Sequence, residues 1–149
     1  MGQWNRVAWD AERLIARAEI EDLLLRWNEV ISDRIWDQYE ELFAPDNSID
    51  FSSIGSQGTD AASHRDFLRD IASGFTSTEH HLLGSPVFLE LERDTARTST
   101  HCLTIARMAG GALFVVGVIY HDWLVRTEDG WRIKRKECQR VFTEPDSDI

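Results

Sequence analysis

The stretch VIYHDWLVRTEDGWRI, residues 118–133, carries the clearest indication of backbone structure in the chain. Two segments rich in aromatic and β-branched residues flank the dipeptide Asp129-Gly130. An Asp-Gly pair between two such segments is typical of a tight β-hairpin, because glycine readily adopts the positive φ that the turn requires. The stretch therefore predicts two long antiparallel strands joined by a short turn.

More strand-like segments lie around this hairpin, and turns rich in Gly, Asp or Arg separate them. The predicted long strands are residues 80–92, 95–108, 112–127 and 131–142, and a shorter one is predicted at 48–55. On the last strand, Arg132, Lys134 and Lys136 share the face predicted to meet solvent, and alternation places Arg135 with the apolar set.

Helical patterns precede the strands. Residues 10–31 have an apolar stripe at helical spacing, and shorter helices are predicted at 36–43 and 61–75. Helices followed by an antiparallel meander indicate an α+β fold. A long, bent antiparallel sheet wrapped around helices would leave a pocket between the two layers.

Length and composition limit the classes of function. At 149 residues with 42% hydrophobic content, the chain is expected to form one domain. A net charge of −10 argues against nucleic acid and anionic membranes as partners. The longest uncharged apolar run, residues 108–120, is too short to span a bilayer, so a cytoplasmic location is expected. Cys102 and Cys138 have no metal-ligand or redox spacing and are expected to be buried thiols.

The order of elements and several motifs resemble the nuclear-transport-factor-2-like superfamily, a cone-shaped α+β fold. More narrowly, they resemble its SnoaL-like group, which includes scytalone dehydratase, bile-acid 7α-dehydratase and a hexachlorocyclohexane dehydrochlorinase. The resemblance covers about residues 12–143 and implies that the core of the domain spans them. The segments that carry it are DLLLRW, DRIWDQYEELFAPD, EHHLLGSP, DTARTST, VIYHDWLVRTEDGWRI and QRVF. Because the superfamily also contains isomerases, cyclases and binding proteins, the fold alone does not assign a reaction.

The resemblance implies a general base among the paired histidines. The dehydratases of this group carry their base five residues before the proline of the first long strand, which is His81 here. Adjacent strand residues face opposite sides, so one histidine of the pair is expected in the pocket and His80 on the solvent side. A one-residue shift in strand register would exchange their roles. The aspartate that orients the base in the family falls at Ser32, so Asp33 is the candidate partner.

Further side chains are candidates for contacting the substrate. Trp27 stands where the family often has tyrosine, and Tyr120 could donate to a developing oxyanion. The remaining candidates are His101 and Asp122 on strands, Arg135 as a charge that needs a partner, and Arg140 in the family's closing motif.

The sequence and the resemblance together predict a cofactor-independent lyase of dehydratase type, or an isomerase, with no metal, acting on a hydrophobic cyclic small molecule. Two alternatives remain open. One is a polyketide or terpenoid cyclase of the same fold, and the other is a non-catalytic domain that binds a small ligand. The resemblance also implies a homo-oligomer, a dimer or trimer, formed through an exposed sheet face that includes His121, Trp123 and Val125.

Overall fold

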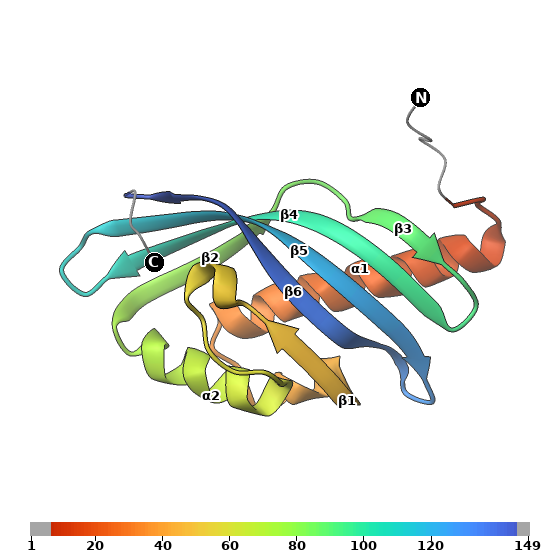
Figure 1. Cartoon of the computed structure of the whole chain (residues 1–149), viewed down its shortest axis with the longest axis horizontal. Helices are drawn as coiled ribbons and strands as arrows, with labels where there is room; N and C mark the ends of the chain where they lie inside the picture. The colour runs from red at the N-terminus through yellow and green to blue at the C-terminus, as the bar shows by residue number, and fades with distance from the viewer. Residues whose placement is uncertain (1–6, 146–149) are drawn as a thin grey trace.

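The structure is a computed structural model, and residues 7–145 are described. The fold is α+β, with two helices packed against a strongly curved mixed sheet that does not close (Figure 1). The helices are α1 (Ala11–Ser32) and α2 (Ala61–Ala72), with three single-turn 3₁₀ helices, η1 (Trp36–Gln38), η2 (Glu40–Leu42) and η3 (Ser52–Ile54). The strands are β1 (Phe43–Asp50), β2 (Phe75–Leu82), β3 (Val87–Leu91), β4 (Thr95–Met108), β5 (Leu113–Thr127) and β6 (Gly130–Glu144).

Helix α1 has well-defined ends. Asp10 is its N-cap and accepts a hydrogen bond of 2.9 Å from the backbone N–H of Arg13. At the other end, Arg34 takes a positive φ of 59° directly after the C-cap residue Asp33, which stops the helix and turns the chain. The buried side chains of α1 include Ile20, Leu24, Trp27 and Ile31.

The sheet order is β1-β6-β5-β4-β2, and β3 also pairs with β4. The β5–β6 hairpin predicted around Asp129-Gly130 is confirmed, and Gly130 has a φ of 98°. The expected all-antiparallel sheet is wrong at one edge, because β1 runs parallel to β6. The chain leaves α1 through η1 and η2, and β1 then enters the sheet beside the last strand rather than beside the next one in sequence.

Several predicted elements have different boundaries. The strand predicted at residues 48–55 is β1, which ends at Asp50 and is followed by η3, and the helix predicted at residues 61–75 ends at Ala72. The helix predicted at residues 36–43 is instead η1 and η2, and β1 already begins at Phe43. The single strand predicted at residues 80–92 is two strands, β2 and β3. Gly84 has a φ of 85° and Pro86 lacks a backbone N–H, so the ladder cannot continue between them.

A bulge in β6 changes which of its side chains face the core. Trp123 pairs with Arg135, but Leu124 pairs with Ile133, so Lys134 is an extra residue in β6. Beyond the bulge the alternation is inverted: Lys136 is buried and Arg135 is exposed. The prediction that Lys136 meets solvent and Arg135 lies with the apolar set is therefore wrong, because strict alternation does not allow for the extra residue.

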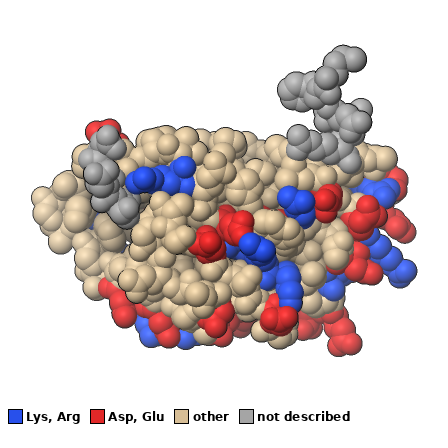
Figure 2. Space-filling view, viewed as in Figure 1, with Lys and Arg blue, Asp and Glu red and all other residues tan. Residues whose placement is uncertain are grey.

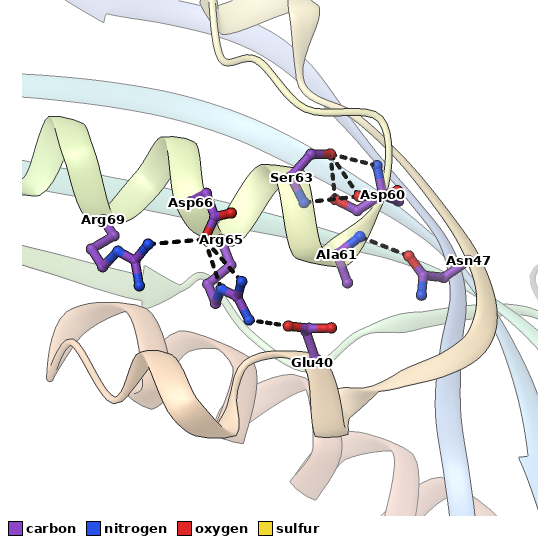
Figure 3. A network of polar contacts seen from close by, with 8 residues as sticks. All are labelled: Glu40, Asn47, Asp60, Ala61, Ser63, Arg65, Asp66 and Arg69. Atoms are coloured by element: carbon purple, nitrogen blue, oxygen red, sulfur yellow. Dashed lines mark hydrogen bonds and ion pairs between the residues drawn. The ribbon is translucent and has the colours of Figure 1, made fainter.

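Polar contacts attach helix α2 to the segment that carries η2 and β1 (Figure 3). Asp60 caps the helix and forms a capping box with Ser63. The first helical N–H, that of Ala61, donates to the Asn47 side chain at 2.7 Å, and Arg65 pairs with Glu40. These contacts fix the rotation of α2, so His64, which lies between Ser63 and Arg65, faces the interior.

Charged side chains lie mainly on the surface. On the face drawn in Figure 2, they gather in the centre, along the lower edge and at the right-hand end. Four large apolar side chains near the β4–β5 turn and the end of β6 are about half exposed: Met108, Leu113, Val141 and Phe142. Within residues 7–145, no helix is long and apolar enough to cross a bilayer.

Candidate active site

A cavity of about 170 Å³ lies between the helices and the concave face of the sheet. Its walls come from α1, η1, η3, α2, β2, β4 and β5, and most of the side chains in them are apolar. The volume is similar to that of a cavity of about 150 Å³ that binds benzene in another protein. The polar side chains in the wall are few: Arg34, Ser56, His64, Thr78, His80, Thr104 and Tyr120.

His80 is the histidine of the 80–81 pair that lines this cavity. Its Nδ1 lies 3.2 Å from the Ser32 hydroxyl, and its backbone N–H donates to the same oxygen at 3.2 Å. Its ring packs against that of Trp27 in a T-shaped arrangement, with the ring centroids 5.9 Å apart. When the Ser32 hydroxyl accepts from Nδ1–H, Nε2 is unprotonated and can accept a proton from a ligand.

The surroundings of His80 favour neutral imidazole. Burial, together with the positive charge of Lys136, lowers the pKa of His80 to about 4. A neutral imidazole is in the correct protonation state to act as a base at pH 7, although a low pKa makes it a weak one.

The two histidines face the opposite sides from those predicted, with His80 in the cavity wall and His81 outside it. The side chain of His81 is 53% exposed and lies 3.1 Å from Glu79, outside the cavity. Asp33 is an exposed C-cap residue outside the cavity wall, and Ser32 occupies the place beside the pocket histidine. The reason is strand register: His80 pairs with Thr104, whose side chain also faces the cavity.

A second buried histidine, His64, was not among the predicted site residues. It is fully buried on α2, with Nδ1 2.6 Å from the Tyr39 hydroxyl and Nε2 3.1 Å from Ser56 Oγ. Burial lowers its pKa to about 4. Its place in AASHRDFL, on a helix whose other inward residues are apolar, is the sequence feature that could have indicated a buried role.

A buried ion pair supports the wall formed by Trp27 and Tyr120. The Lys136 ammonium donates to both carboxylate oxygens of Asp122, at 2.9 and 3.2 Å. It also lies 4.3 Å from the ring centroids of both Trp27 and Tyr120. Asp122 is thus a buried supporting residue of the site and does not line the cavity.

The other predicted contacts divide into two groups. Trp27 and Tyr120 line the cavity, with ring centroids 5.1 Å apart. His101, Arg135 and Arg140 are exposed and lie outside it. His101 was predicted to face the pocket because it shares a strand face with apolar residues. That face of β4 points outward, and the buried face carries Thr98, Thr100 and Cys102.

Arg34 is the only charged residue among the described residues of the cavity wall. Its guanidinium donates to the Phe75 carbonyl oxygen at 2.6 Å, which ties the end of α1 to the start of β2. With no carboxylate in the described wall, the cavity is electrostatically suited to a neutral ligand or one with a developing negative charge. Within residues 7–145, no cluster of His, Cys, Asp or Glu is arranged to hold a metal ion.

Comparisons with known proteins agree with this architecture. The family described as the SnoaL-like domain matches residues 12–137. An uncharacterized protein of Mycobacterium tuberculosis is 31% identical over 128 residues, which cover 85% of this chain and 86% of the relative.

Solved structures share the fold at lower identity. A candidate scytalone dehydratase from Novosphingobium aromaticivorans has a TM-score of 0.81 and 19% identity, with 93% of this chain and 91% of that chain covered. A hexachlorocyclohexane dehydrochlorinase from Novosphingobium barchaimii has a TM-score of 0.79 and 16% identity, with 95% and 97% covered. The resemblance identified from the sequence is confirmed at the level of family and fold.

Proposed function

This chain belongs to the SnoaL-like domain family, and on that premise we propose that it is a cofactor-independent lyase of dehydratase type, or an isomerase, acting on a hydrophobic cyclic small molecule. The proposed general base is His80. The observation that carries the proposal is a neutral imidazole in the wall of a mostly apolar cavity, with Nδ1 engaged by Ser32. An apolar site excludes water and strengthens the electrostatic interactions inside it.

In the proposed reaction, Nε2 of His80 removes a proton from a ring carbon. The electron pair of the broken C–H bond forms a double bond, and a hydroxyl on the neighbouring carbon leaves with its bonding pair. The imidazolium then returns its proton to the departing hydroxide, so that water is released and His80 is neutral again. If the proton returns to a different carbon instead, the same first step leads to an isomerised double bond.

The low pKa of His80 restricts the substrate. A base with a pKa of about 4 removes protons efficiently only from an acidified carbon, such as one next to a carbonyl. Ser32 also stabilises imidazolium less than a carboxylate would, because it carries no charge. The cavity volume of about 170 Å³ favours a ligand with a single ring. Aldol-type closure of a polyketide or terpenoid, the alternative of a cyclase, would begin with the same proton abstraction.

One observation favours a second candidate, a non-catalytic domain that binds a small ligand. The Ser32 hydroxyl can either donate to Nδ1 or accept from it, whereas a carboxylate can only accept and so fixes the proton on Nδ1. Without a fixed tautomer, His80 would serve as a hydrogen-bonding group for a ligand and not as a base.

Deuterium exchange separates the two candidates. The protein is incubated in D₂O with 3-hydroxycyclohexanone, and NMR follows both deuterium uptake next to the carbonyl and formation of the unsaturated ketone. We expect the His80→Gln variant to lose at least 100-fold in exchange rate, since a positioned base contributes about 10²–10⁴-fold. The matched control, His81→Gln, should retain the full rate. Exchange at the same rate in both variants would refute a base at His80.

Restoring the family's carboxylate provides a gain-of-function test. Ser32→Asp should raise the pKa of His80, because a negative charge close to Nδ1 stabilises imidazolium. The exchange rate at pH 7 should rise with it. A higher pKa without faster exchange would favour the binding-domain candidate.

The outer face of the sheet is the proposed site of self-association. His121, Trp123 and Val125 lie there on β5 and are partly exposed. Partly exposed aromatic and apolar side chains on a sheet face are typical of protein interfaces. Light scattering at micromolar concentration tests this proposal, and a monomer that is unaffected by Trp123→Glu would contradict it.

A further inference from the structure

Tyr39, His64 and Ser56 form a chain of hydrogen bonds that ends in the cavity. The Tyr39 hydroxyl lies 2.6 Å from Nδ1 of His64, and Nε2 of His64 lies 3.1 Å from the Ser56 hydroxyl. Tyr39 and His64 are fully buried, whereas Ser56 is partly exposed and lines the cavity. None of the three is needed by the base step proposed for His80.

The chemistry of the three groups determines which atom donates in each of these hydrogen bonds. Burial raises the pKa of Tyr39, so the phenol keeps its proton and can donate it. In the described part of the protein, no acceptor other than His64 hydrogen-bonds to the Tyr39 hydroxyl. Tyr39 therefore donates to Nδ1, which places the single N–H of the neutral imidazole on Nε2. That N–H donates to Ser56 Oγ, and the Ser56 O–H remains available as a donor.

The segment that carries Ser56 is held firmly against α2. Gly58 has a φ of 100°, and a Cβ atom at this position would lie 2.5 Å from the backbone nitrogen of His64. The Ser56 backbone N–H donates to the Phe51 carbonyl at 3.2 Å, and the Phe51 ring packs on His64 with centroids 4.7 Å apart. The backbone that carries Ser56 is thus held by packing on both sides, as a preorganised donor requires.

We propose that Ser56 donates a hydrogen bond to a carbonyl or hydroxyl oxygen of the bound ring compound, and that His64 and Tyr39 position and polarise this donor. The inference rests on the proposed function in one respect, namely that this cavity is the substrate site. A ring ketone bound in this way would direct its oxygen to Ser56 and its acidic C–H to His80. Ser56 would then stabilise the oxyanion that develops as the proton leaves.

The tautomer of His64 is the first test, and it requires no ligand. Two-bond ¹H–¹⁵N NMR spectra of the intact protein at pH 7 distinguish protonated Nε2 from protonated Nδ1. We expect His64 to be protonated at Nε2, and we expect the Tyr39→Phe variant to show a larger share of the Nδ1–H form. A wild-type His64 protonated at Nδ1 would overturn the proposal, because the chain would then run in the opposite direction.

The second test uses two probes of nearly the same shape, cyclohexanone and methylenecyclohexane, and NMR titration of each. Only the ketone can accept a hydrogen bond. Ser56→Ala should weaken cyclohexanone binding about three- to tenfold, the value of one hydrogen bond. The affinity for methylenecyclohexane should change by less than about twofold. The matched control, Ser52→Ala, removes an exposed hydroxyl that bonds to Asp50 and should change neither.

Each outcome of the titration supports or overturns the proposal. Equal losses for both probes, no loss for the ketone, or failure of both probes to bind wild-type protein would overturn it. The result is independent of catalysis. If Ser56→Ala removes the ketone preference while no deuterium exchange depends on His80, the donor site stands and the lyase proposal fails. If exchange depends on His80 but Ser56→Ala leaves binding unchanged, the lyase proposal stands and the donor proposal fails.

Discussion

Replacing Lys136 by methionine should destabilise the protein strongly. The side chains of Lys136 and Asp122 are 2% and 1% exposed, and the ammonium contacts both carboxylate oxygens. Removal of the lysine leaves a buried, unpaired carboxylate, which typically costs about 3–5 kcal/mol. The loss of the contacts with the Trp27 and Tyr120 rings adds about 0.5–2 kcal/mol. A domain with a total stability of about 5–15 kcal/mol would lose a large share of it.

Urea denaturation of a double-mutant cycle measures this effect. The Asp122→Leu/Lys136→Met double variant removes both charges and should be close to wild type, since apolar replacement of a buried pair is often neutral or stabilising. Lowering the pH should reduce the difference in the free energy of unfolding between Lys136→Met and wild type. The unpaired Asp122 is then protonated and no longer carries a buried charge. If Lys136→Met costs less than about 1 kcal/mol, or the double variant is as unstable as the single one, the pair is not the buried unit described above.

Three further predictions concern stability. His64 has a pKa of about 4 when folded and an ordinary value of 6.5, so the unfolded state binds more protons between these values and stability should fall as the pH drops from 6.5 to 4. The share of this loss due to His64 should be about 3 kcal/mol by urea denaturation. His80, whose pKa is also lowered to about 4, adds its own share, so the His64 share is the difference in pH dependence between wild type and a His64→Gln variant. A variant whose pH dependence is not reduced would contradict this cause. Gly58→Ala should lower the melting temperature, because of the positive φ and the 2.5 Å approach to His64, whereas Gly110→Ala, with open space around it, should not. Thr98 Oγ1 is buried with no hydrogen-bond partner in the described chain, so Thr98→Val should be neutral or stabilising by about 1 kcal/mol, and a clear loss in urea would reveal a missing partner.

The pair His80-His81 illustrates how far sequence reasoning reaches at this site. Strand alternation correctly requires that one of the two faces the cavity and the other does not. Which one does so depends on the pairing of β2 with β4, where His80 is opposite Thr104. A shift of one residue exchanges the two faces, and the sequence spacing to Pro86 does not determine it because a turn at Gly84 intervenes.

Lys136 and His64 were missed for different reasons. The β6 bulge at Lys134 inverts the alternation after it, and a bulge has no reliable signature within a strand rich in charged residues. His64 is a lone histidine on a helix, and its partners Tyr39 and Ser56 come from separate turns of the chain. Only the packing of α2 against those turns brings the three side chains together.

The sequence by itself determined the elements whose signals are local. Helix α1, the hairpin at Asp129-Gly130 and the α+β order depend on periodicity, capping and turn residues within a few positions of one another. The tertiary structure decided the parallel edge between β1 and β6, the choice of His80 over His81 and the burial of Lys136 with Asp122. These features depend on strand register and on contacts between distant segments, and a register shift of one residue leaves the local pattern unchanged while it reverses which side chains reach the cavity.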